Sequence, residues 1–364
     1  MSYFKKIFLS LLIMSGFSAN PLFAGNPDRV GQAGAMELLI NPWARSSGWA
    51  GANTAGIAGG EAMRFNVAGI LGVNKTELNF ARTTWLSGTD IYINSFSFTQ
   101  KVGSEGNGAL SVSLMSMDVG DIQRTTFEAP DGTLGTYSPT MVNIGVGYAR
   151  KFSDQIRGGV AMRVINQAIP DASATGVAID AGIQYHTDLV QGSDLQRTKL
   201  GVSLRNVGTP MRFEGDGLDG RGRFEDNDVD RTLRSRSAEF DLPSLLHIGV
   251  SQDFYLDDAL MHKLTVAATF TSNSYTRDNF LFGLQWSGFD ELIMLRGGLY
   301  YEDDIFSEED RAVVFTGPAA GATVNIPFGK EDKHGNKKRF AFDYAFRSTN
   351  PFSGVHVIGA RVSL

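Results

Sequence analysis

A cluster of acidic and basic side chains in the sequence could bind a metal ion or another protein. Asp226, Asp228 and Asp230 have the spacing with which an EF-hand calcium loop begins. The sixth position of such a loop needs glycine and the twelfth a bidentate glutamate, whereas this sequence has Arg231 and Ser237 there. The pattern therefore favours a solvated loop that contacts a protein over a calcium site. The candidate partner-binding residues are Asp216, Asp219, Arg221, Arg223, Glu225, Asp226, Asp228 and Asp230.

The sequence lacks the residue patterns that usually carry catalysis. Its five histidines are scattered, and none has the spacing of a zinc ligand pair. There is no Gly-x-Ser-x-Gly motif, no P-loop lysine and no cysteine. Distant strands can still assemble a catalytic triad, so an enzyme is disfavoured but not excluded. We therefore expect that the protein is not an enzyme and that it has no catalytic residue, no bound metal and no cofactor.

The N-terminal end of the chain predicts export. Lys5 and Lys6 precede an apolar run, and a small residue, Ala24, closes the predicted signal peptide (residues 1–24), with Ala19 as the alternative cleavage position. Removing these residues changes the formal net charge from −6 to −8, since the two lysines are their only charged side chains. This mild acidity argues against nucleic acid as a partner.

The remaining composition fits a membrane protein that has no spanning helix. The chain has 364 residues, 42 glycines and no cysteine, which excludes both a disulfide framework and a lipoprotein anchor. No run of about 18 apolar residues follows the export signal. The mean hydropathy of −0.10 is compatible with membrane strands, because alternating apolar and polar residues average out.

The elements that must position these side chains are strands. In residues 109–114, 142–149 and 340–346, apolar or aromatic side chains alternate with small or polar ones. Strands of about ten residues with one apolar face are typical of a transmembrane antiparallel β-barrel. The barrel (residues 74–364) is predicted to have about fourteen strands, an even number, at 76–86, 90–101, 108–118, 139–151, 155–168, 175–187, 198–207, 244–255, 262–272, 279–288, 291–302, 314–327, 338–347 and 355–364.

The gaps between these strands predict an orientation. Three long gaps, at 119–138, 208–243 and 303–313, fall on the same end of the barrel, while several gaps of opposite parity are short. Long outer loops and short periplasmic turns are typical of bacterial outer-membrane barrels. We therefore expect a Gram-negative outer membrane, contact with its lipid, and a monomeric barrel whose long loops face outward.

Residues 25–73 do not alternate and are rich in glycine and small side chains. Such a segment can pack closely against other backbone, so we interpret it as an N-terminal plug inside the barrel. A gate or ligand-contact element is the alternative. The structural motif of this predicted plug comprises Arg45, Gly48, Gly51, Asn66 and Gly69.

Several charged residues fall on the polar faces of predicted strands and would point into the lumen. We expect them to pair with one another across it rather than line a path for solutes. They are Arg157, Arg163, Asp180 and Arg205.

Several short motifs in the plug and the strands gain specificity from their order along the chain. They are residues 38–40, 44–52, 65–69, 120–122, 132–138, 147–152, 178–182, 205–208 and 342–346. In these motifs the sequence resembles the PorV/PorQ family, outer-membrane proteins of the type IX secretion system with FadL-like fourteen-stranded barrels. This resemblance implies a Bacteroidota-like source. It also implies partners among the translocon barrel, the C-terminal signal domains of secreted cargo, and the cell-surface attachment complex.

Besides the disfavoured enzyme, which would need a polar triad at the barrel rim, the sequence supports two functional hypotheses. In the first, the barrel is a non-enzymatic component of type IX secretion whose outer loops bind cargo or complex subunits, in part by strand addition. In the second, it is a FadL-type transporter of hydrophobic small molecules with a movable plug. The transporter hypothesis predicts an apolar pocket above the plug and a lateral or axial opening.

Overall fold

The structure is a computed structural model of the chain. It describes residues 29–103, 106–132, 134–188, 197–223, 230–257, 259–329 and 337–364. The predicted export signal and residues 25–28 of the predicted plug lie outside the described residues.

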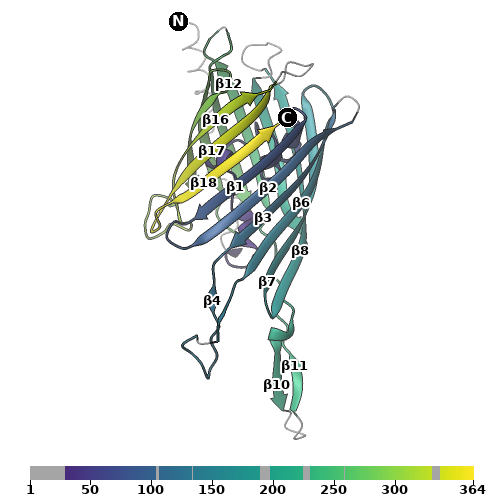
Figure 1. The fold of residues 1–364 in the computed structure, drawn as a ribbon, viewed down its shortest axis with the longest axis vertical. Coiled ribbons are helices and arrows are strands. Elements are labelled where there is room, and N and C mark those ends of the chain that lie inside the picture. Colours follow the sequence, from purple (N-terminus) through teal and green to yellow (C-terminus); the bar gives the residue numbers. More distant parts are fainter. Residues whose placement is uncertain are drawn as a thin grey trace.

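In the described part of the chain, fourteen antiparallel strands close into one barrel (Figure 1). Closure occurs where the first strand pairs with the last, from Glu77↔Ser363 to Thr84↔His356. The predicted fourteen-stranded antiparallel barrel is confirmed, and the predicted strand boundaries agree with the observed ones to within three residues. The barrel strands are β1 (Thr76–Trp85), β2 (Ile91–Val102), β3 (Gly108–Asp118), β6 (Thr140–Lys151), β7 (Ile156–Ile169), β8 (Ala172–Thr187), β9 (Thr198–Gly208), β12 (Leu245–Tyr255), β13 (Lys263–Asn273), β14 (Asn279–Gly288), β15 (Ile293–Glu302), β16 (Phe315–Phe328), β17 (Lys338–Thr349) and β18 (Val355–Ser363).

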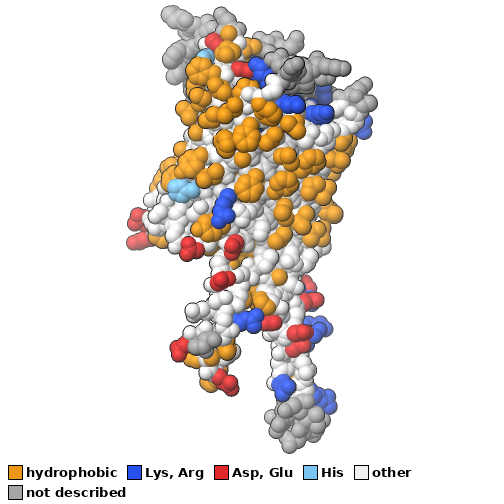
Figure 2. All heavy atoms as spheres, viewed as in Figure 1, with side chains coloured by type: hydrophobic (Ala, Val, Ile, Leu, Met, Phe, Trp, Pro, Cys, Tyr) orange, Lys and Arg blue, Asp and Glu red, His pale blue; other side chains and the backbone are white. Residues whose placement is uncertain are grey.

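Alternation of side chains along each strand explains why the sequence forms a barrel wall. On β6, Ile144, Val146 and Tyr148 are exposed on the outside, whereas Asn143 and Ala149 are buried inside. The same alternation on the other strands produces a belt of apolar side chains around the wall, which Figure 2 shows on one face. An apolar outer face can contact lipid, and closure of the wall pairs each barrel strand with a neighbour on both sides.

The two ends of the barrel differ. β1 begins and β18 ends at one end, which we call the C-terminal end. At the opposite end, the arm end, two hairpins extend beyond the wall (Figure 1). One hairpin pairs β4 (Ile122–Gln123) with β5 (Thr136–Tyr137), and the other pairs β10 (Asp219–Arg223) with β11 (Asp230–Arg234), preceded by the short helix η5 (Asp216–Leu218). Both hairpins lie within gaps that the sequence predicted to be long loops.

Residues 29–73, which we call the N-terminal segment, pack against inward-facing side chains of the wall. The segment contains the short helices η2 (Met36–Leu39), α2 (Ala44–Ser47), η3 (Gly60–Arg64) and η4 (Val67–Gly72). Helix α2 contacts β16, β17 and β18, η3 contacts β1, β2 and β3, and η4 contacts β3, β6, β7 and β8. Among the described residues, no helix has the length and hydropathy required to cross a membrane.

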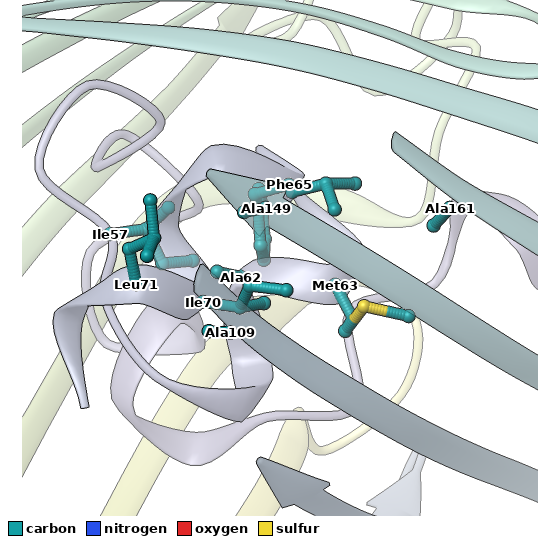
Figure 3. Close-up of a cluster of buried hydrophobic side chains, with 10 residues drawn as sticks. Ile57, Ala62, Met63, Phe65, Ile70, Leu71, Ala109, Ala149 and Ala161 are labelled. Atoms are coloured by element: carbon teal, nitrogen blue, oxygen red, sulfur yellow. The ribbon is translucent and has the colours of Figure 1, made fainter. Parts of the chain in front are cut away.

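Small side chains on the wall allow this close packing. In Figure 3, apolar side chains of the N-terminal segment lie against three alanines that β3, β6 and β7 point inward. A larger side chain at these wall positions would push η3 and η4 away, because protein interiors are close-packed. The members of this cluster are Ile57, Ala62, Met63, Phe65, Val67, Ile70, Leu71, Ala109, Ala149 and Ala161.

Candidate functional site

The N-terminal segment begins at the arm end of the lumen. The Arg29 guanidinium donates hydrogen bonds to Asp241 Oδ2 (3.1 Å) and to the Tyr275 hydroxyl (3.0 Å), and it stacks 4.2 Å from the centre of the Tyr275 ring. Tyr275 also donates to Asp241 Oδ2 at 2.9 Å. Asp241 precedes β12, and Tyr275 lies in the turn between β13 and β14 at the arm end. These contacts fasten the start of the segment there.

The segment ends at the opposite, C-terminal end, where it continues into β1. On the way, the Thr269 hydroxyl of β13 donates to the Ala52 carbonyl at 2.8 Å. Further on, the Gly60 amide donates to Glu77 Oε1 of β1 at 2.8 Å. The N-terminal segment therefore runs the length of the lumen, and contacts at several levels hold it to the wall.

The five residues of the predicted plug motif all lie in this segment. Arg45 forms an ion pair with Glu61 and donates to the Ala58 carbonyl. A Cβ atom at Gly48 would lie only 2.9 Å from Gly321 Cα of β16, and Gly51 has a φ of 88°, so both positions require glycine. Asn66 caps η4 through the Ala68 amide and donates to the Ile183 carbonyl of β8 at 3.0 Å, while the Gly69 carbonyl accepts from the Gly59 amide at 3.0 Å.

Charged side chains inside the barrel are held by an ion pair and by hydrogen bonds. Arg163 of β7 forms a buried ion pair with Asp180 of β8 at 2.6 Å and donates to the Met63 carbonyl at 3.0 Å. Asp180 also accepts from the Asn206 amide at 2.6 Å, and Arg205 lies 3.4 Å from the His247 ring nitrogen. Pairing therefore occurs between Arg163 and Asp180, but Arg157 forms no ion pair with any described residue.

Four aromatic side chains and one valine lie together inside the barrel at the arm end. We call this group the arm-end aromatic patch; it consists of Trp43, Trp85, Tyr300, Phe315 and Val355. The Phe315 ring lies edge-on to Trp85 at 5.9 Å and 6.1 Å from Tyr300. Trp43 and Val355 are buried beneath them, while Trp85, Tyr300 and Phe315 stay half-exposed. The guanidinium of Arg347 lies 3.6 Å over the Phe315 ring. This surface could hold a small apolar molecule.

The wall beside this patch is interrupted. Pairing of β15 with β16 ends at Leu299↔Pro318, although both strands extend further toward the arm end. Pro318 has no amide to donate, and Gly317 has a φ of 111°. The register between β16 and β17 also shifts between Phe315 and Ala319. The arm-end part of the β15–β16 seam therefore lacks ladder hydrogen bonds and is the best candidate for a lateral opening.

A cavity of about 580 Å³ lies at the other, C-terminal end of the lumen. Its lining is predominantly charged and polar, and it includes Arg45, Glu77, Arg296 and Arg361. This cavity is not the apolar pocket that the transporter hypothesis placed above the plug. The apolar surface at the arm end is a patch of half-exposed rings instead.

The candidate partner-binding residues lie in the β10–β11 hairpin. Asp219 of β10 accepts two hydrogen bonds from Arg234 of β11, at 2.9 and 3.2 Å. Asp216 lies in η5, Arg221 is exposed, and the backbones of Arg223 and Asp230 pair with each other. Glu225, Asp226 and Asp228 lie outside the described residues. Within the described residues, no group of three histidine or carboxylate side chains is placed to hold a metal ion.

Sequence reasoning missed the arm-end contacts. Arg29 is an isolated basic residue in an irregular stretch, and nothing local connects it with Asp241. The aromatic patch could have been found in part, since Gly317 and Pro318 inside a predicted strand mark an irregular wall. Trp43 and Trp85 give no such signal, because aromatic side chains also occur at the membrane interface of any barrel.

The fold resembles that of several solved outer-membrane barrels. It resembles the Pseudomonas putida toluene transporter TodX with a TM-score of 0.53 and 11% identity, over 89% of this chain and 98% of that one. It resembles a Pseudomonas aeruginosa FadL homologue with a TM-score of 0.52 and 10% identity, over 88% and 98%. The monoaromatic hydrocarbon channel CymD gives a TM-score of 0.51 and 12% identity, over 90% and 98%.

These likenesses establish the FadL-like barrel fold. No protein-family model and no curated protein sequence matches the chain. The resemblance to the PorV/PorQ family therefore rests on the short sequence motifs alone.

Proposed function

We propose that the chain is an outer-membrane channel that admits small apolar molecules from its arm end, which faces the cell exterior. The arm-end aromatic patch beside the interrupted β15–β16 seam is the observation that carries this proposal. Three barrels of the same fold bear names that describe hydrocarbon or toluene transport, or FadL homology. A shared fold does not identify the substrate, so the proposed substrate class depends on the patch.

Apolar surface lies on both sides of the seam. On the lumen side, Phe315 and Tyr300 present half-exposed rings. On the outer side, Leu299 and Tyr301 are 36% and 40% exposed. An apolar solute that leaves the bilayer here would exchange one apolar surface for another. It would avoid the cost of entering water, which is about 25 cal/mol per Å² of apolar area.

Passage beyond the patch requires the N-terminal segment to move. Trp43 of the segment forms the floor of the patch, and the helices behind it pack tightly on the wall. The segment therefore acts as a movable plug: it closes the lumen at rest, and part of it shifts as the solute passes. Its short helices suit this role, because helices of four to six residues gain little stability of their own.

Uptake of radiolabelled toluene by intact Gram-negative cells tests the proposal. Cells that express the protein should accumulate toluene faster than cells with an empty vector. Trp85→Ala should reduce the initial rate several-fold, because it removes the largest half-exposed ring of the patch. Phe98→Ala is the matched control, since Phe98 is an aromatic residue on the outer face of β2. Equal rates with and without the protein would refute the channel.

A second candidate function is supported by the two hairpins that extend beyond the arm end (Figure 1). Long projections on a rigid barrel suit recognition of another protein, as the resemblance to type IX secretion components implies. Deletion of residues 215–236 should then abolish binding of cargo or complex subunits while leaving a heat-resistant barrel. Unchanged secretion after this deletion would remove the second candidate.

A further inference from the structure

The charges around the cavity at the C-terminal end of the lumen are unbalanced. Among the described residues that line it, seven side chains are basic and four are acidic. Four of the basic ones come from the stretch β15–β18, which adds no carboxylate to the lining. We call this group the basic wall; it consists of Arg296, Lys337, Arg339 and Arg361.

Three of the four carboxylates that line the cavity are already bound to cations. Asp253 accepts from Lys199 at 2.9 Å, and Glu291 accepts from Lys263 at 2.8 Å. Asp290 lies 3.0 Å from Arg339 and 3.6 Å from Lys337, so one carboxylate serves two members of the basic wall. These pairs leave little negative charge for the rest of the wall.

Two arginines of the basic wall are buried without a carboxylate partner. Arg361 is 8% exposed and forms no ion pair with any described residue. Arg296 is 5% exposed and donates to Gln285 Oε1 and Thr323 Oγ1, both at 2.6 Å, but it also has no carboxylate within ion-pair distance in the described chain. A buried cation is costly unless a negative group balances it.

Three further carboxylates also have partners of their own. Glu77 accepts from the Gly60 amide at 2.8 Å and from Asn79 at 2.9 Å. Asp343 accepts from Thr323, and Glu61 binds Arg45.

We propose that the basic wall binds a small organic anion carrying more than one carboxylate or phosphate group. Arginine suits such ligands, because its planar fork can bond two oxygens of one anionic group. The cavity volume lies within the range of small-molecule sites, roughly 300–1,000 Å³. The side chains of Asp290 and Lys337 at its rim are 55% and 42% exposed, so solutes can reach it from the C-terminal end.

Titration calorimetry with citrate, on the full protein in a non-ionic detergent, tests this proposal. The wild-type protein should bind citrate and not sucrose, a neutral solute, and added salt should weaken the binding. Arg361→Gln should weaken citrate binding about tenfold or more, because it removes a charge-assisted bond. Arg361→Lys should retain part of the affinity, which a purely structural role would not predict.

Arg150→Gln is the control, since Arg150 is exposed on the outer face of β6 near the same end. Retention of the heat-resistant band in gel electrophoresis shows that each variant is folded. If Arg361→Gln does not fold, Arg296→Gln replaces it as the test variant. The absence of citrate binding to the wild-type protein, or citrate binding by Arg361→Gln that equals that of Arg150→Gln, would overturn the proposal. This test does not measure toluene uptake, so the anion site and the proposed channel are tested independently.

Discussion

Arg29 and Asp241 lie 212 positions apart in the sequence and form an ion pair at the arm end of the barrel, with N–O distance 3.1 Å. Tyr275 closes the group by bonding to both. The pair fastens the start of the N-terminal segment to the end opposite the one where the segment enters β1. The segment is thus held at both ends of the lumen, and a shift of its middle part need not release either end.

Loss of the Arg29 contact should loosen the start of the segment. The side chains of Arg29 and Asp241 are 37% and 45% exposed. The ion pair and the stacking of Arg29 on Tyr275 together therefore stabilise the attached segment by about 1 kcal/mol. Arg29→Ala should therefore speed amide hydrogen exchange in residues 33–38 about fivefold. Asp154→Asn, which removes an exposed ion pair with Lys151 at the other end, is the control. Unchanged exchange in Arg29→Ala would show that the contact does not hold the segment.

Close packing of the segment on the wall predicts a steric effect at Gly48. A Cβ atom there would meet Gly321 Cα at 2.9 Å, so Gly48→Ala should force α2 away from β16 and cost about 1–3 kcal/mol. The temperature at which the folded band disappears in gel electrophoresis should fall. Gly297→Ala is the matched control, because a Cβ atom at Gly297 of β15 would meet no atom within 4 Å. Equal melting of the two variants would contradict the packing described here.

The β10–β11 hairpin should respond to acid. Hydrogen bonds from Arg234 hold the pKa of the Asp219 carboxyl below its usual value. The ionised carboxylate therefore stabilises the paired hairpin fully above the unfolded pKa of about 3.9, and this contribution is lost as the pH falls through the lower folded value. NMR titration of the Asp219 carboxyl, with amide signals of Gly220 and Leu233 as reporters, measures the pKa of this carboxyl and the response of the hairpin to pH. Asp219→Asn should abolish the pH response, and an Asp219 pKa at or above 3.9 in the wild type would refute it.

The sequence predicted the wall well because the relevant signal is local. Alternation such as that of residues 142–149 decides both the strand and its outward face, and burial on β6 follows it residue by residue. The two arm hairpins were missed because stretches such as Asp219–Arg223 have no apolar alternation. The path of the N-terminal segment was beyond sequence reasoning, since it depends on contacts such as Arg29–Asp241 between distant residues. The basic wall was missed for the same reason, since Arg296 of β15, Arg339 of β17 and Arg361 of β18 are distant in the sequence and face one cavity only in the closed barrel.

A reversible covalent lock tests most directly whether solute passes through the lumen by displacing the N-terminal segment. A Cβ atom at Gly182 of β8 would lie 3.0 Å from Asn66 Cγ, so Asn66→Cys with Gly182→Cys can form a disulfide in a chain that has no cysteine of its own. Toluene uptake by oxidised cells should fall to the empty-vector rate and return after dithiothreitol, while Asn66→Cys alone should respond to neither treatment. Undiminished uptake by the fully oxidised double variant would contradict the account.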